Sequence, residues 1–71
     1  MKLSARNVLT GTVTTINRGV TTSVVHLDCS GTPITASITN EAVDELGLVP
    51  GSKAHAIIKA SNVMLAADRP E

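Results

Sequence analysis

Short segments in which apolar and polar residues alternate, separated by turn residues, make up most of this chain. The alternation has period two in residues 5–16, 20–29 and 34–39, and it returns in 52–59 and 62–67. Successive side chains of a β-strand point to opposite faces of the sheet, so period two is typical of a half-buried strand. The chain is therefore predicted to fold around five short strands.

Turn sequences divide these segments. Residues 17–19, 30–33 and 50–51 contain the Gly, Pro, Asn and Ser combinations that favour turns. Gly11 lies inside the first segment, where an isolated glycine indicates a bulge or the sharp bend that a small barrel needs at a corner. The predicted strands are thus joined by short connections, as in a small barrel or sandwich.

Helix signals replace the alternation at residues 40–46. Asn40 is a good N-cap, and Glu41 complements the helix dipole in the first turn. Gly47, followed by apolar Leu48, is typical of a Schellman C-terminus. The apolar stripe of this short helix consists of Ala42, Val43 and Leu46.

Three strands, a short helix and two further strands is the element order of an OB-fold. We expect an all-β protein with small α content: a five-stranded, OB-fold-like Greek-key barrel with one short helix between its third and fourth strands. The alternating faces also fit a small SH3-like barrel, but the capped helix favours the OB-fold. Such barrels host many unrelated sites, so the fold alone does not give the function.

The composition predicts self-association. The chain has 71 residues, enough for one small domain, and contains no Phe, Tyr or Trp. Burying a Val or Leu contributes about 1.5–3 kcal/mol, whereas ordering each residue costs about 1.5 kcal/mol. Small domains with so thin a core often gain further burial by forming oligomers.

The charge balance disfavours one class of partner. Six basic and six acidic residues give a net charge of zero. Nucleic-acid binders usually carry a basic excess, and single-strand binders also use aromatic stacking platforms, so no nucleic-acid partner is expected. There is no apolar run near the ~20 residues of a membrane span and no signal peptide. With Cys29 as its single cysteine, the chain is expected to be a soluble cytoplasmic protein without a membrane partner.

Two polar segments near opposite ends of the chain are the strongest functional signal. Residues 4–7 read Ser-Ala-Arg-Asn and residues 59–62 read Lys-Ala-Ser-Asn. Arg and Lys donate hydrogen bonds and accept none, and Ser and Asn add further donors. This set suits a ligand made only of acceptors, such as a tetrahedral oxyanion, which would gain charge-assisted hydrogen bonds. If the fold brings the segments together, within one chain or between chains, they form an anion site.

The alternative is that Arg6 and Lys59 are ordinary solvated surface charges. The Ser and Asn residues beside both cations, and their positions next to strands, favour a site instead. Backbone amides at 40–42 are a secondary candidate, because helix N-termini bind anions.

Other chemistry is not indicated. His26 and His55 are far apart in the sequence and have no carboxylate or cysteine at metal-ligand spacing. Cys29 has no neighbouring base and is predicted to be a small buried apolar residue. The sequence offers no nucleophile with a base and no carboxylate pair in a predicted cleft, so we expect no enzymatic activity and no directly bound metal.

Four sequence strings resemble a known family. They are Ser4-Ala5-Arg6-Asn7 with Gly11 following, Thr39-Asn40-Glu41-Ala42-Val43, Glu45-Leu46-Gly47-Leu48, and Ile58-Lys59-Ala60-Ser61-Asn62-Val63-Met64. In this order and at this spacing they resemble the Mop family of small molybdate-binding proteins, the molbindins. The resemblance covers residues 1–68 as a single Mop domain and leaves 69–71 as a C-terminal tail.

The resemblance implies a homohexamer, a trimer of dimers, that binds molybdate or tungstate between subunits. The oxyanion-binding residues that it implies are Ser4, Ala5, Arg6, Asn7, Thr39, Lys59, Ala60 and Ser61. It also implies a possible second oxyanion site near a symmetry axis, at Gly19 and Val20.

The expected function is therefore intracellular molybdenum storage, buffering or homeostasis by oxyanion binding, since no DNA-binding or ATPase segment accompanies the domain here. The alternative is a structural or regulatory subunit that docks on a molybdate transporter or regulator, whose assembly would be indifferent to oxyanion. A single-stranded nucleic-acid binder on the same fold is the least favoured of the three.

Overall fold

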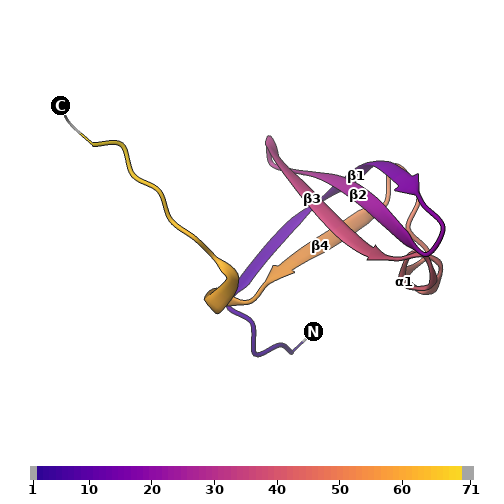
Figure 1. Cartoon of the computed structure of the whole chain (residues 1–71), viewed down its shortest axis with the longest axis horizontal. Coiled ribbons are helices and arrows are strands. Elements are labelled where there is room, and N and C mark those ends of the chain that lie inside the picture. Colours follow the sequence, from indigo (N-terminus) through magenta and orange to yellow (C-terminus); the bar gives the residue numbers. More distant parts are fainter. Residues whose placement is uncertain (1, 70–71) are drawn as a thin grey trace.

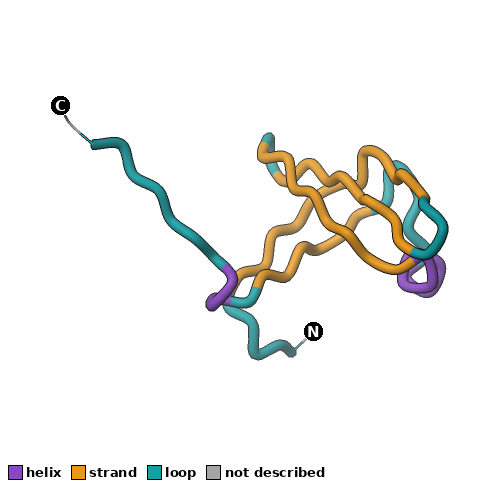
Figure 2. Tube along the Cα trace, viewed as in Figure 1, coloured by secondary structure: helices purple, strands orange, loops and turns teal. Residues whose placement is uncertain are grey.

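Four antiparallel strands form one curled sheet, with a short helix at one end of it (Figures 1 and 2). The computed structural model describes residues 2–69. Met1 of the predicted domain and residues 70–71 of the predicted tail lie outside the described residues. The elements in chain order are β1 (Asn7–Arg18), β2 (Thr22–Cys29), β3 (Thr32–Thr39), α1 (Asn40–Leu46), β4 (Lys53–Ile58) and the 3-10 turn η1 (Ala60–Asn62). The order of strands in the sheet is β3-β2-β1-β4.

Strand β1 curls the sheet because it changes partners along its length. Its first half, residues 7–12, pairs with β4, and its second half, residues 12–18, pairs with β2. The ladder to β2 is interrupted by an irregularity between Val13 and Thr15. A bulge of this kind bends a strand and increases its twist. Strand β1 therefore pairs with β4 on one side and with β2 on the other, and its bend closes the sheet toward a barrel.

The sequence predicts a bulge or bend at Gly11, but the irregularity in β1 lies slightly later, between Val13 and Thr15. Gly11 is instead needed because the backbone of β2 passes very close to it. A Cβ atom at Gly11 would lie 2.4 Å from the carbonyl oxygen of Asp28 and 2.6 Å from Sγ of Cys29. Only glycine fits so close to the end of β2. The sequence signal was correct in marking a special position but wrong about the reason.

The core lies on the concave face of β2 and the strands beside it. Its buried apolar side chains are Val13, Val25, Leu27, Cys29 and Val43. The predicted alternation in β2 is confirmed, because its odd-numbered residues from 23 to 29 are buried. Cys29 is a free, buried cysteine, as predicted. The same residues 2–69 expose eleven large apolar side chains, so burial within one chain is far from complete.

Helix α1 forms where the sequence predicts it, but its capping residue is Thr39. The Oγ1 atom of Thr39 accepts a hydrogen bond from the N–H of Ala42 at 3.0 Å, so the assignment of the cap to Asn40 is wrong. Gly47 adopts the left-handed conformation, with φ of 64°. The N–H of Leu48 bonds back to the helix at 3.1 Å, which completes the predicted Schellman C-terminus.

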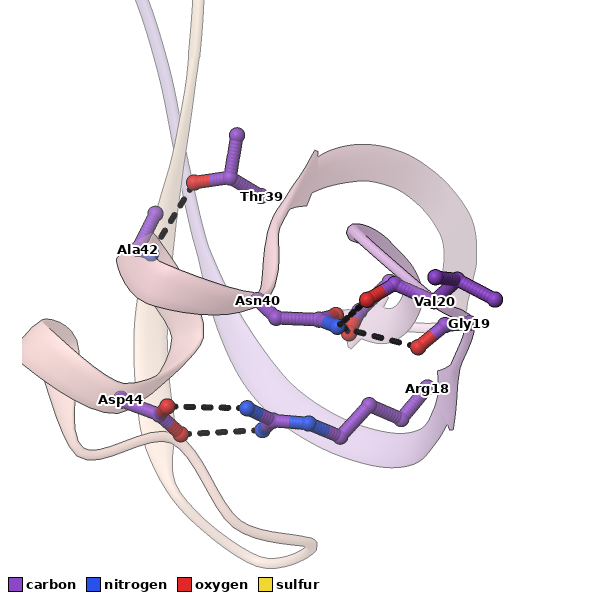
Figure 3. A network of polar contacts seen from close by, with 8 residues as sticks. Arg18, Gly19, Val20, Thr39, Asn40, Ala42 and Asp44 are labelled. Carbon is purple, nitrogen blue, oxygen red and sulfur yellow. Dashed lines mark hydrogen bonds and ion pairs between the residues drawn. The ribbon is translucent and has the colours of Figure 1, made fainter.

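Asn40 instead links α1 to the turn between β1 and β2 (Figure 3). Its Nδ2 donates to the carbonyl oxygens of Gly19 and Val20, at 3.0 and 3.2 Å. Its Oδ1 accepts from the Oγ of Ser23 at 2.5 Å, and its backbone N–H donates to the carbonyl of Thr21 at 2.9 Å. Ser23 is fully buried, so the bond to Asn40 satisfies a hydroxyl that would be costly to leave without a partner.

An ion pair joins the same parts of the molecule (Figure 3). Both terminal nitrogens of the Arg18 guanidinium donate to the Asp44 carboxylate, at 2.9 and 2.8 Å. These hydrogen bonds lower the pKa of Asp44 and raise the pKa of Arg18. The two side chains are 48% and 63% exposed, so solvent screens the pair. We call α1, the turn at 19–21 and this ion pair the helical end.

The predicted fifth strand at 62–67 is not formed in the described chain. After β4, η1 redirects the backbone, and residues 63–69 run away from the sheet as an exposed segment without regular structure (Figures 1 and 2). The alternation in this segment suits a strand, but a strand also needs a neighbouring edge, and the chain does not turn back to β3 or β4. The fold is mostly β with one helix, and its four strands form a barrel that is open on one side. Among the described residues there is no helix with the length and hydropathy of a membrane span.

Candidate anion-binding site

The pairing of β1 with β4 brings the two polar segments together within one chain. Asn7 lies opposite Ile58 in this ladder, so the residues just before β1 and just after β4 emerge side by side. Between them is a depression of about 470 Å³, which we call the basic hollow. Its lining residues are Ser4, Ala5, Arg6, Lys59, Ala60 and Ser61. All six were predicted from the sequence as oxyanion-binding residues.

The chemistry of the basic hollow is that of a hydrogen-bond donor. Arg6 and Lys59 contribute two positive charges, Ser4 and Ser61 contribute hydroxyl groups, and no acidic residue is among the six lining residues. Arg and Lys offer only donors, and a Ser hydroxyl can turn its proton toward an acceptor. The arrangement therefore suits an anion whose surface consists of acceptor oxygens.

The basic hollow is wide and open in the single chain. Five of its six lining residues are exposed, and Ala5 is half-buried. On the order of fifteen water molecules, at about 30 Å³ each, would fill such a volume. The hollow is thus much larger than a single tetrahedral anion. A second surface, such as another copy of the chain, would bring the donors into contact with a small anion.

Asn7 is not a lining residue of the basic hollow, but it joins the two strands next to it. Its Nδ2 donates to the carbonyl oxygen of Ile58 at 3.2 Å, which ties the start of β1 to the end of β4. Asn7 also lines a neighbouring, smaller depression together with Arg6 and Val63. Its place in the oxyanion site stays a prediction, and its observed role is to hold the two segments in register.

The remaining predicted site residues lie at the helical end. Thr39 caps α1 through its Oγ1 and is not a lining residue of the basic hollow. Gly19 and Val20 form the turn held by Asn40, with Val20 99% exposed and the Gly19 N–H donating to the carbonyl of Thr22 at 2.8 Å. Within one chain the structure therefore does not bring these three residues to the basic hollow. Their contribution to anion binding in an assembly stays a prediction.

The histidines pair with strand hydroxyls. Oγ1 of Thr10 and Nδ1 of His55 lie 2.9 Å apart, and Oγ1 of Thr35 and Nδ1 of His26 lie 3.3 Å apart. Residues 2–69 contain no group of three or more His, Cys, Asp or Glu side chains placed to hold a metal ion. The chemistry of the described chain is concentrated in the basic hollow.

Comparisons with known proteins agree with this reading of the fold. The model of the TOBE domain matches residues 3–65. A probable molybdenum-pterin-binding protein of Haemophilus influenzae is 46% identical over 66 residues, which cover 92% of this chain and 96% of that protein. The chain therefore belongs to the TOBE-domain family. The resemblance to the Mop proteins within that family is confirmed.

Two solved structures show the same fold. The structure of a molybdate-binding protein from Sporomusa ovata superimposes with a TM-score of 0.90 at 39% identity, covering 94% of this chain and all of that one. The cytoplasmic molybdate-binding protein ModG, in a form with molybdate bound, superimposes with a TM-score of 0.87 at 57% identity. That match covers 90% of this chain and 46% of ModG. The H. influenzae and S. ovata matches show that a domain of this length also occurs as nearly the whole of a protein.

Proposed function

We propose that this chain binds molybdate, or the closely similar tungstate, in the basic hollow and serves as an oxyanion-binding protein, not an enzyme. The observation that supports this best is the convergence of Arg6 and Lys59, with two serine hydroxyls, in one depression without acidic lining residues. Molybdate is a tetrahedral dianion with only acceptor oxygens. Charge-assisted hydrogen bonds from two cations are about twice as strong as neutral ones and match that charge.

The inorganic anion fits this chain better than a pterin does. The H. influenzae relative carries pterin in its name. A pterin ring would be held most simply by stacking on an aromatic side chain, and this chain contains no Phe, Tyr or Trp. The basic hollow also lacks an apolar aromatic wall. We therefore assign the site to the free oxyanion.

The site is completed in a homo-oligomer, for which we propose the hexameric trimer of dimers. The eleven exposed large apolar side chains among residues 2–69 and the open basic hollow both favour association. A ligand that binds only the assembled form stabilises the assembly, so oxyanion binding and assembly are thermodynamically linked. The physiological role that follows is intracellular storage or buffering of molybdenum.

Isothermal titration tests the proposal directly. Protein of known mass, established by light scattering, is titrated with molybdate, with tungstate, and with sulfate as the control anion. We expect clear saturable binding of molybdate and tungstate and much weaker binding of sulfate. A folded oligomer that releases no heat with molybdate would contradict the proposal and would favour the alternative of a structural or regulatory subunit.

A further inference from the structure

The basic hollow has room for more than an inorganic anion, and part of its wall is apolar. Its volume is about 470 Å³, which corresponds to on the order of fifteen water molecules. Ala5 and Ala60 line it together with the hydrogen-bond donors. The hollow can therefore admit a tetrahedral anion that carries a small organic group.

Lys59 brings a nucleophile to the same hollow. A neutral amine attacks a carbonyl carbon readily, whereas a serine hydroxyl needs a neighbouring base, and no histidine or carboxylate is among the six lining residues. Lys59 is exposed. The one ion pair within residues 2–69 joins Arg18 to Asp44, so no carboxylate of this part of the chain holds the Lys59 amine. The amine is thus available to a molecule bound beside it.

We propose that Lys59 is a modification site, acylated by small acyl phosphates that bind in the basic hollow. The phosphate group of such a molecule is a tetrahedral oxyanion, so Arg6 and Ser4 can hold it as they would hold molybdate, while the acyl group lies against the alanine methyl groups. The reaction belongs to the open hollow that the single chain presents. The inference rests on the anion-binding capacity of the proposed function, but not on a preference for molybdate.

The reaction is an acyl transfer in which the acyl phosphate is the only co-reactant. The lone pair of the neutral Nζ amine of Lys59 attacks the carbonyl carbon and forms the N–C bond of an amide. The C–O bond to the phosphate breaks, and inorganic phosphate leaves with that electron pair. The proton lost from nitrogen passes to water or to the departing phosphate. Arg6 stabilises the negative charge that develops on the leaving group.

Acylation would weaken the hollow as an anion site. The amide product is uncharged, so the modification removes one of the two cations that line the hollow. Molybdate affinity should then fall by about 10- to 100-fold, since a charge-assisted hydrogen bond is lost. Conversely, a bound oxyanion occupies the donors that hold the phosphate and protects Lys59. The modification therefore couples the oxyanion capacity of the protein to the supply of acyl phosphates.

Lys53 provides a matched control near the other end of β4. It is exposed like Lys59 but is not a lining residue of the basic hollow. The full chain, in buffer without other oxyanions, is incubated with acetyl phosphate, and peptide mass spectrometry follows the acetylation of each lysine with time. We expect Lys59 to react at least about 10-fold faster than Lys53, because binding holds the reactants side by side. Equal rates for the two lysines would overturn the inference.

A variant and a second reagent separate binding from ordinary reactivity. In Arg6→Ala the advantage of Lys59 over Lys53 should fall to less than about 3-fold, because the bound phosphate loses its cation. The N-hydroxysuccinimide ester of acetic acid carries no phosphate, and it should acetylate the two lysines of the wild type at similar rates. A preference for Lys59 that this ester shares, or that survives in Arg6→Ala, would overturn the inference, since the lysine would then be reactive without a bound phosphate.

Competition by molybdate distinguishes failure of this inference from failure of the proposed function. Molybdate should slow the acetylation of Lys59 and leave the rate at Lys53 unchanged. If titration detects molybdate binding but Lys59 has no advantage over Lys53, the acylation inference is overturned and the proposed function stands. If Lys59 is acetylated preferentially, and molybdate neither binds nor protects it, the acylation inference is supported and the proposed function fails.

Discussion

The two ends of this small barrel differ in how their polar groups are used. At the helical end, Asn40 uses both side-chain polar atoms and its backbone N–H, and Arg18 and Asp44 pair with each other. At the other end, the cations of the basic hollow face solvent, and the C-terminal segment leaves the sheet (Figure 1). The polar groups of the helical end are paired within one chain, whereas we propose that those of the basic hollow are paired by a ligand and a second copy.

This difference implies that the helical end mainly contributes to the stability of the fold and the open end mainly to anion binding. Hydrogen bonds that stay within the chain stabilise the fold whether or not a ligand is present. Donors that face solvent contribute little to the fold and remain available to an anion. Substitutions at the open end should therefore change affinity, and substitutions at the helical end should change stability.

The largest expected effect is on affinity. Arg6→Ala and Lys59→Ala should each weaken molybdate binding by about 10- to 100-fold, since a hydrogen bond to a charged group contributes roughly 1.5–3 kcal/mol. Isothermal titration measures the loss. Lys53→Ala is the control, because Lys53 begins β4 at the end away from the basic hollow. If all three variants bind as the wild type does, the basic hollow is not the site.

Asn40→Ala should have the largest effect on stability. It removes the partner of the buried Ser23 hydroxyl and two bonds to the turn, so the free energy of unfolding should fall by about 1–3 kcal/mol. Urea unfolding followed by circular dichroism at a fixed protein concentration measures it, since the chain has no fluorescent aromatic residue. Asn17→Ala, at an exposed position of β1, is the control and should change stability little. An equal effect of the two substitutions would contradict the role given to Asn40.

Thr39→Ala should be somewhat milder. Loss of the N-cap bond to Ala42 should lower the free energy of unfolding by about 1 kcal/mol, and Thr39→Ser should restore most of it because serine keeps the hydroxyl. The same unfolding measurement applies. A serine variant as unstable as the alanine variant would show that the methyl group, and not the cap, matters. A loss of molybdate affinity that serine rescues would support the sequence prediction that Thr39 reaches an anion in the assembly.

The smallest expected effect concerns the Arg18–Asp44 pair and depends on pH. Because the pKa of Asp44 is lowered by its bonds to Arg18, the pair stabilises the fold above the carboxyl's ordinary pKa of 3.8. That contribution is lost as pH falls through the lower pKa of the folded state. Asp44→Asn should therefore lower the melting temperature by at most about 2 °C at neutral pH and by nothing at strongly acidic pH. A difference that grows on acidification would contradict this sign.

Much of the fold could be predicted from the sequence because its signals are local. The inward face of β2, the bounds of α1 and the glycine at its C-terminus all follow from residues within a few positions of one another. The two polar segments could be recognised for a similar reason, because the donors of each are contiguous in the sequence. The set of six residues came from the family resemblance, and the antiparallel pairing of β1 with β4 that joins the segments was not predicted.

The errors concern features that depend on distant contacts. Thr39 and Asn40 are both good caps, and only the turn at 19–21, which Asn40 binds, decides that Thr39 takes this role. The bend in β1 lies next to the residue at which its pairing changes from β4 to β2. Sequence periodicity does not reveal that position, because it depends on the partner strands. Residues 62–67 alternate like a strand, but alternation does not show whether a neighbouring edge is available, and in the described chain these residues form no strand.

The most direct test of the account is the position of the bound anion. Crystals grown with tungstate would give a strong anomalous signal at tungsten, and we predict a peak within hydrogen-bond reach of the Arg6 and Lys59 side chains, with a second copy of the chain closing the basic hollow. A peak only beside Gly19 and Val20 at the helical end, or a basic hollow filled by water at saturating tungstate, would contradict the account.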